Sequence, residues 1–201
     1  MYLTRAEISM ASRFGADCAR DAQKMHEVVT GLTGSKQSEN HVTYRVNANG
    51  NRLIVYFYSD KGAVNQLQSV DITGEKDISS WIESLEAGKT FAFDLLAVPS
   101  KKVKADGKKN SQRRLLKNPE ERIAWLHRKA EQNGFQIVNV TELKEVSKTI
   151  RHPAHKGGMM HVNAYQYQGV LIIKNEQLFR ECFCHGIGSG KAYGFGMLLL
   201  K

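Results

Sequence analysis

The feature that most constrains the fold of this chain is an order of strand and helix patterns that occurs twice. In the first half, alternating apolar and polar residues predict strands, and apolar residues at intervals of three and four predict a helix. The dipeptide Asn49-Gly50 predicts a tight turn between two strands. The strand patterns lie at residues 1–10 and at 41–59 as a hairpin, and the helix pattern lies at 19–32. Residues 62–72 offer a short connection and a strand, and residues 78–88 are ambiguous. The order is strand, helix, strand, strand, weak helix, strand.

The second half repeats this order with clearer patterns. Its strongest helix pattern is residues 118–134, with Asn118 as the N-cap, Pro119 in the first turn and Gly134 at the end. Strands are predicted at residues 89–98, 136–140, 161–174 and 192–200, and a second helix is predicted at 175–185. Two consecutive βαββαβ units are typical of two ferredoxin-like domains. We therefore predict an α+β protein with two tandem ferredoxin-like (βαββαβ, RRM-like) domains, at residues 1–88 and 89–201.

Positive charge is concentrated in one half of the chain. Residues 1–90 hold 10 Lys and Arg against 11 Asp and Glu, whereas residues 91–201 hold 19 against 9. This asymmetry favours a nucleic-acid partner and, less strongly, a membrane surface. Residues 1–10 contain no signal-peptide core, and no stretch approaches the roughly 18 apolar residues of a membrane span. We therefore expect a cytoplasmic protein with no membrane partner.

Residues 186–196, GIGSGKAYGFG, form a glycine-rich loop with one lysine, Lys191. A nucleotide-binding P-loop requires Ser or Thr after Gly-Lys, and this chain has Ala192 there. A dinucleotide-binding loop leads from a strand into a helix, whereas this loop leads from a predicted helix into a predicted strand. Two interpretations stay open: a helix cap with a tight turn, or a bare backbone that a polyanion can approach.

Two further segments concentrate basic residues. Residues 99–118 hold eight Lys and Arg and one Asp, and we expect a long basic loop or hairpin there. Residues 147–161 join two predicted strands and contain Arg151 and Lys156. Each segment is either a solvated loop or a clamp on a phosphate backbone.

Few side chains suggest chemistry by themselves. His152, His155 and His161 lie near one another, but no Cys or carboxylate accompanies them, so we predict no metal and no cofactor. The three cysteines have no disulfide or metal-site spacing, and we interpret them as small apolar residues. His26 lies beside the apolar stripe of the first helix, where either an edge histidine or a proton-transfer group would fit.

Several motifs resemble, in order, those of the CasE family, the CRISPR-associated endoribonucleases that process repeat RNA in the type I-E system. The segment KMHEVVTGL resembles the helix with the family's catalytic histidine, and FDLLAVPSKKV is similar to its LRANP segment with a following lysine. The segment VNAYQYQGVLII resembles the strand that contains FEG. The most specific match, besides that strand, is GIGSGKAYGFGMLLL, which is similar to the family's G-x-G-x-x-K-x-x-G-x-G ending.

The resemblance implies metal-independent cleavage at the base of a CRISPR repeat stem-loop. In this chemistry the ribose 2′-OH attacks the scissile phosphate and leaves a 2′,3′-cyclic phosphate and a 5′-OH. The resemblance makes His26 the catalytic residue and implies other subunits of the type I-E Cascade complex as partners. The RNA-binding residues it suggests are Lys101, Lys102, Arg113, Arg114, Arg151, Lys156 and Lys191.

A second hypothesis is a non-catalytic RNA-binding module of the same fold. Gln23 stands where the family often has a tyrosine, and an amide cannot transfer a proton at neutral pH. Without the resemblance, the composition and the sequence patterns support only a basic, two-domain protein that binds nucleic acid.

Overall fold

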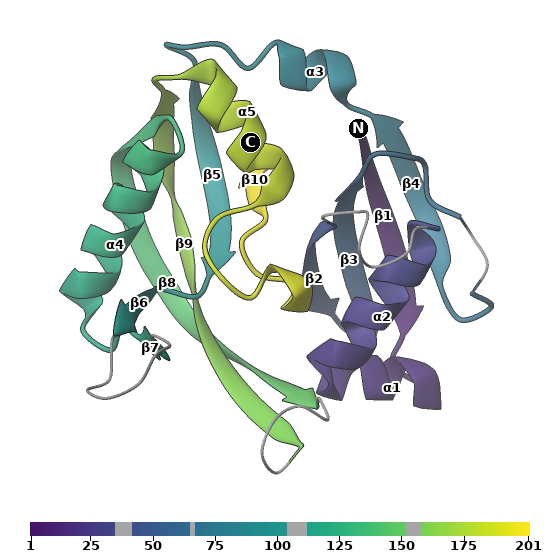
Figure 1. Cartoon of the computed structure of the whole chain (residues 1–201). Coiled ribbons are helices and arrows are strands. Elements are labelled where there is room, and N and C mark those ends of the chain that lie inside the picture. The colour runs from purple at the N-terminus through teal and green to yellow at the C-terminus, as the bar shows by residue number, and fades with distance from the viewer. Residues whose placement is uncertain (35–41, 65–66, 104–111, 152–157) are drawn as a thin grey trace.

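Two four-stranded antiparallel sheets lie side by side, and the helices cover the same side of both (Figure 1). The computed structural model describes residues 1–34, 42–64, 67–103, 112–151 and 158–201. The first sheet has the order β2-β3-β1-β4 and the second has the order β10-β5-β9-β8. Both orders are those of a ferredoxin-like sheet, so the predicted fold class is confirmed.

The first sheet carries two short helices. Its strands are β1 (Tyr2–Ser9), β2 (Thr43–Asn49), β3 (Arg52–Ser59) and β4 (Asp71–Asp77), and its helices are α1 (Arg13–Arg20) and α2 (Ala22–Leu32). The side chain of Ser12 caps α1, and that of Asp21 caps α2. Apolar side chains of α2, among them Met25 and Val29, pack against Ala6 of β1 and its neighbours to form one core.

The second sheet is larger and carries a small basic hairpin. Its strands are β5 (Thr90–Ala97), β8 (Phe135–Arg151), β9 (Met159–Ile173) and β10 (Leu198–Leu200), and its helices are α4 (Pro119–Gln132) and α5 (Glu176–His185). The hairpin strands are β6 (Ser100–Val103) and β7 (Gln112–Leu115), and a 3-10 turn, η1 (Lys191–Tyr193), interrupts the glycine-rich loop. Trp125 and Leu126 of α4 and Phe179 of α5 are buried against this sheet.

The strands of the two sheets lie within residues 2–77 and 90–200. The short helix α3 (Ser79–Glu83) lies between them in the sequence. The boundary near residue 88 stays a prediction. In the part of the chain that the structure describes, no helix is long and apolar enough to cross a membrane.

Four sequence-based predictions of individual elements were wrong. The helix predicted at 19–32 is present as α2 but begins only at Ala22, because Asp21 ends a separate helix, α1, that was not predicted. The weak helix expected between the third and fourth strands is absent from the described residues, and α3 follows β4 instead. The strand predicted at 192–200 shrinks to β10, because glycines with positive φ hold the preceding segment in turns.

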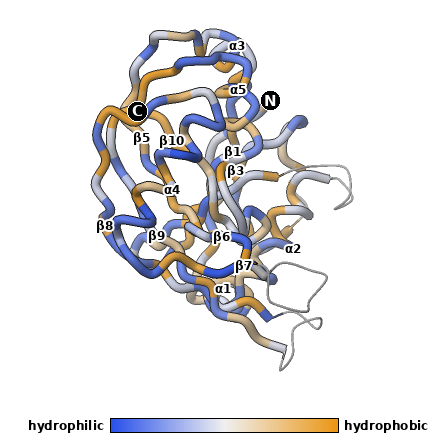
Figure 2. Tube along the Cα trace, turned by 60° about the vertical axis from the view of Figure 1, so that its left-hand side comes forward, coloured by the Kyte–Doolittle hydropathy of each residue, from blue (hydrophilic) through white to orange (hydrophobic). Residues whose placement is uncertain are grey.

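The fourth error concerns the length of strands β8 and β9. Residues 147–161 were predicted to be a connection, yet β8 and β9 pair from Phe135–Ile173 to Arg151–Met159. Hydrophobic and hydrophilic segments alternate along β8, the outer strand of its sheet (Figure 2). β8 is a polar edge strand, and bulges at Ile137/Asn139 and Glu142/Lys144 interrupt its alternation. The sequence pattern therefore did not indicate the full length of the strand.

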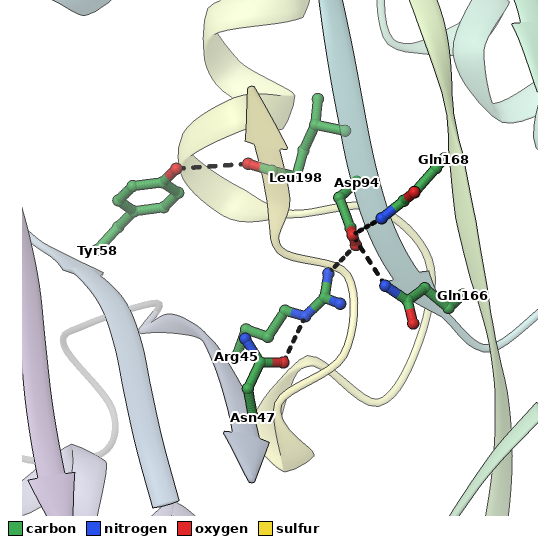
Figure 3. A network of polar contacts seen from close by, with 7 residues as sticks. All are labelled: Arg45, Asn47, Tyr58, Asp94, Gln166, Gln168 and Leu198. Carbon is green, nitrogen blue, oxygen red and sulfur yellow. Dashed lines mark hydrogen bonds and ion pairs between the residues drawn. The ribbon is translucent and has the colours of Figure 1, made fainter. Parts of the chain in front are cut away.

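A buried ion pair joins the two sheets (Figure 3). Arg45 of β2 donates to the Asp94 carboxylate of β5, and both residues are buried. The amides of Gln166 and Gln168 on β9 donate to the other carboxylate oxygen, over 2.8 and 2.6 Å. Burial acts to raise the pKa of Asp94, but the hydrogen bonds from Gln168, Arg45 and Gln166 outweigh burial and lower it below the usual value.

Replacing Asp94 with Ala should lower the free energy of unfolding by about 3–5 kcal/mol, because it leaves the Arg45 guanidinium buried without its partner. Urea denaturation of both variants measures the effect. Arg52→Met is the matched control, since Arg52 and Glu7 pair at the surface, and its unfolding curve should barely move. Equal curves for the two variants would contradict a structural role for the buried pair.

Candidate functional site

His26 lies on α2, at the side of the helix that faces the second domain. The apolar stripe of α2, which includes Met25 and Val29, faces the core, and His26 is half-buried beside it. Its imidazole meets the ring of Tyr193 edge to face, with 6.4 Å between ring centroids. Burial lowers the pKa of His26, although Glu27 acts in the opposite direction. The lowered pKa favours the neutral form of the imidazole near pH 7.

The turn η1 connects the histidine to a basic surface. Tyr193, its last residue, contacts His26, and Lys191, its first residue, lines a pocket on the other side of the turn. The hydroxyl of Tyr44 on β2 donates to the carbonyl of Ala192 over 2.9 Å, which attaches η1 to the first sheet. The glycine-rich loop therefore lies between the two domains, as Figure 1 shows.

The basic pocket is a cavity of about 500 Å³ between the β6–β7 hairpin, α4 and the glycine-rich loop. Six basic side chains line it: Lys101, Lys102, Arg113, Arg128, Lys129 and Lys191. Four of them are predicted RNA-binding residues, which lie up to 90 positions apart in sequence and converge here. Trp125 and the backbone of Gly186 and Gly188 supply the remaining walls.

The basic side chains act on one another. Burial lowers the pKa of Lys129, and the charges of Arg128, Arg113 and Lys191 lower it further. Burial also lowers the pKa of Lys191. One carboxylate neutralises part of this charge, because Glu121 accepts a hydrogen bond from Lys101 over 3.0 Å. An anion entering the pocket would relieve the repulsion, so the pocket suits phosphate groups.

The remaining predicted RNA-binding residues lie elsewhere. Arg114 is exposed on β7, opposite Lys101 in the hairpin. Arg151 is exposed at the end of β8, and its backbone N–H donates to the Asp21 carboxylate over 3.1 Å. Lys156 lies outside the described residues.

A second cavity, of about 590 Å³, lies on the other side of Tyr193. We call it the helix–hairpin cavity, because α1, α2, the β2–β3 hairpin and the β8–β9 hairpin enclose it. The Lys148 side chain on β8 lines it and donates to the carbonyl of Tyr193 over 2.9 Å. The Lys148 ammonium also lies 4.6 Å from the centre of the Phe195 ring. Burial lowers the pKa of Lys148 to about 8.

Sequence reasoning missed Arg128, Lys129, Lys148, Tyr193 and Asp21 as members of the site. Arg128 and Lys129 are part of a strong helix pattern, in which basic residues normally face solvent. Lys148 lies on β8, in the part of the strand beyond the predicted end at residue 140. The one available signal was the position of Tyr193 inside the glycine-rich loop, where a large aromatic residue needs a packing partner.

The structure offers no metal centre within the described ranges. No group of three or more His, Cys, Asp or Glu side chains there is arranged to hold a metal ion. His161 pairs with the Thr149 hydroxyl over 3.1 Å, whereas His152 and His155 lie outside the described residues.

The sequence model of the CRISPR associated protein family matches residues 1–201. The chain belongs to this family. The resemblance to CasE that the motifs indicate is thereby confirmed. A curated relative, the CRISPR-associated endoribonuclease Cse3 of Thermus thermophilus, is 31% identical over 124 residues. The match spans 57% of this chain and 57% of that relative's length.

Solved structures of two proteins share the fold of this family member. A structure of CRISPR endoribonuclease Cse3 bound to a 19-nucleotide RNA has a TM-score of 0.85 and 23% identity, and the match covers 100% of both chains. A chain of a CRISPR RNA-guided surveillance complex, in a pre-nicking state, has a TM-score of 0.76 and 21% identity, with 100% of this chain and 99% of that chain covered. At these identities the likeness establishes the tandem fold.

The low pKa of Lys148 leads to a prediction about stability. The pKa of Lys148 is about 8 in the fold and 10.5 in an unfolded chain, so the unfolded state binds more protons between these pH values. The free energy of unfolding of the wild type should therefore rise from pH 8 to pH 10.5 relative to that of Lys148→Met, by about 2–3 kcal/mol. Urea denaturation of both proteins at the two pH values checks this. Parallel pH profiles would show that the ammonium is solvated.

Proposed function

We propose that this chain is an endoribonuclease that binds the stem-loop of CRISPR repeat RNA and cleaves at the stem base to produce mature CRISPR RNA. The observation that carries the proposal is the turn η1, which presents Lys191 to the basic pocket and Tyr193 to His26. A phosphate-binding surface and a neutral imidazole thus adjoin. The name of the curated relative, an endoribonuclease, and the RNA bound to a structural neighbour support the proposal.

The proposed reaction is metal-independent. The 2′-oxygen upstream of the scissile phosphate attacks phosphorus, and the bond from phosphorus to the 5′-oxygen breaks. This leaves a 2′,3′-cyclic phosphate and a 5′-OH. His26 accepts the proton of the 2′-OH, a role that suits an imidazole whose pKa burial lowers. Water supplies the proton of the leaving 5′-oxygen, and nearby cations stabilise the charge that develops on the phosphate.

In the proposal, shape and phosphates rather than base edges select the stem. The major groove of an A-form stem is deep and narrow, so proteins contact its backbone and its ends. The β8–β9 hairpin projects toward α1 (Figure 1), with Arg151 at the end of β8. Lys156 follows in the connection that the sequence assigns to RNA contact.

We also propose that the chain assembles with other subunits of the type I-E Cascade complex. A structural neighbour over the whole chain belongs to a CRISPR RNA-guided surveillance complex. No cofactor is part of the proposal.

A non-catalytic RNA-binding module is the second candidate function. The observation that favours it is Gln23, whose side-chain amide donates to Glu27 over 3.4 Å and cannot act as an acid or a base near neutral pH. Incubation with a repeat hairpin RNA in excess EDTA separates the two. Cleavage supports the endoribonuclease, tight binding without cleavage supports the module, and absence of binding contradicts both.

Replacing His26 with Ala should slow cleavage by roughly 10²–10⁴-fold, the usual contribution of general acid–base catalysis. Hairpin affinity should stay nearly unchanged, because one neutral imidazole adds little to binding by many cations. Single-turnover cleavage and filter binding measure the two effects. His127→Ala, at an exposed position of α4, is the control. Loss of binding and cleavage together would identify His26 as a structural residue, and unchanged cleavage would assign the proton transfer to another group.

Changing Arg113 and Arg114 to Glu should weaken RNA binding and reduce its salt dependence, because fewer counterions are released. Loss of two phosphate contacts lowers the slope of log affinity against log salt by about two. The matched control reverses Lys61 and Lys76, two exposed lysines of the first domain. Identical salt slopes for the two double variants would mean that the β6–β7 hairpin is only a solvated loop.

A further inference from the structure

The helix–hairpin cavity combines apolar walls with hydrogen-bond donors. Its apolar lining includes Met25, Val46 and Leu53 from the first domain and Met159 from β9. Ser147, Lys148 and Thr149 of β8 line it as well, and the Lys148 ammonium donates to the carbonyl of Tyr193, another lining residue. A cavity of about 590 Å³ with this lining is large enough for a planar heterocycle and has polar groups to orient it.

The position of this cavity relates it to the proposed reaction. Tyr193 lines the cavity and also contacts His26. Met25, which lines the cavity, precedes His26 on α2. Tyr193 therefore borders both the cavity and the imidazole.

The proposed chemistry requires a change in RNA shape at that place. Attack by the 2′-oxygen needs the attacking oxygen, phosphorus and leaving oxygen nearly in line, as in other phosphoryl transfers. Two nucleotides stacked in an A-form helix do not meet this condition, so one of them must leave the stack. Enzymes that extrude a base hold it in a pocket with stacking and hydrogen bonds.

We infer that the helix–hairpin cavity receives one unstacked nucleobase, from a nucleotide that adjoins the scissile phosphate. This inference rests on the proposed function. The Tyr193 ring provides an aromatic wall for the base. Lys148 uses one of its N–H groups on the Tyr193 carbonyl, and the others can donate to carbonyl oxygens or ring nitrogens of the base.

The charges around the cavity complement the backbone of the same nucleotide. Arg20 and Arg151 line the cavity and are exposed. The nearby carboxylate of Asp21 already accepts hydrogen bonds from the backbone N–H groups of Gln23 and Arg151, over 3.0 and 3.1 Å. The same carboxylate ties the start of α2 to the end of β8 and so fixes two walls of the cavity relative to each other.

The test fills the cavity and follows the base directly. Ala48 lines the cavity from an exposed position of β2, so Ala48→Trp adds bulk without removing a core residue. Asn49→Trp is the matched control, because the next residue along a strand points to the other face of the sheet. Ala19→Trp fills the cavity from α1 and replaces Ala48→Trp if that variant does not fold.

The probe is 2-aminopurine, placed in turn at each nucleotide that flanks the cut in a hairpin made uncleavable by a 2′-deoxy sugar. We expect the emission at one position to change when the wild type and Asn49→Trp bind, and not when Ala48→Trp binds. In cleavable RNA, Ala48→Trp should slow cleavage by about 10²-fold, the usual effect of misplaced reacting atoms, with little change in affinity.

The outcomes distinguish the inference from the proposed function. Cleavage by wild type and Ala48→Trp at equal rates, with the same emission changes, would overturn the inference and leave the endoribonuclease proposal intact. An emission change blocked only by the filling variants, in a protein that does not cleave, would support a base-binding cavity and contradict the enzyme. Absence of hairpin binding by the wild type would contradict both.

Discussion

Backbone carbonyls of the C-terminal segment hold the two domains of this protein together. Thr43 and Tyr44 of β2 donate side-chain hydrogen bonds to the carbonyls of Cys184 and Ala192. Within the second domain, Lys148 of β8 donates to the next carbonyl, that of Tyr193, and so holds the same turn from the other side. Tyr44 is fully buried, so its hydroxyl must have a partner, and burial raises its pKa, which keeps it a donor. The position of the turn η1, and with it of Lys191 and Tyr193, follows from these bonds.

Glycine is required where this segment meets the first domain. Gly194 has a φ of 77°, and a Cβ there would lie 2.8 Å from the Tyr44 ring. Any side chain at this position would push η1 away from β2 and break the bond between Tyr44 and Ala192. Gly194 therefore serves close packing between the domains, and the segment presents Lys191 to the basic pocket and Tyr193 to His26. Of the two interpretations of the loop, the tight turn is confirmed by the positive φ of its glycines, and the polyanion site stays a prediction.

The sequence predicted well what depends on local pattern and poorly what depends on contacts between domains. The helix from Pro119, with its Asn118 cap, and the hairpin at Asn49-Gly50 have strong local signals, and both are present. The cations of the β6–β7 hairpin were predicted from their density, but Arg128 and Lys129 were not, because only the tertiary fold turns their part of α4 toward Lys191. The pairing of Arg45 with Asp94 spans 49 positions and leaves no local trace.

The division of charge between the halves of the chain has a physical reason in the site. Binding phosphates requires many cations in one place, and in the basic pocket the neighbouring charges already lower the pKa of Lys129. A histidine among those cations would have its own pKa lowered by each of them and would be a weaker base. His26 instead lies in the domain that has no excess of positive charge. Its pKa is lowered by its own burial and raised by the nearby charge of Glu27. The turn η1 lies between this imidazole and the basic pocket, so His26 adjoins the pocket without lining it. Two domains of the same fold can thus separate a cluster of cations from a histidine whose pKa those cations would lower further.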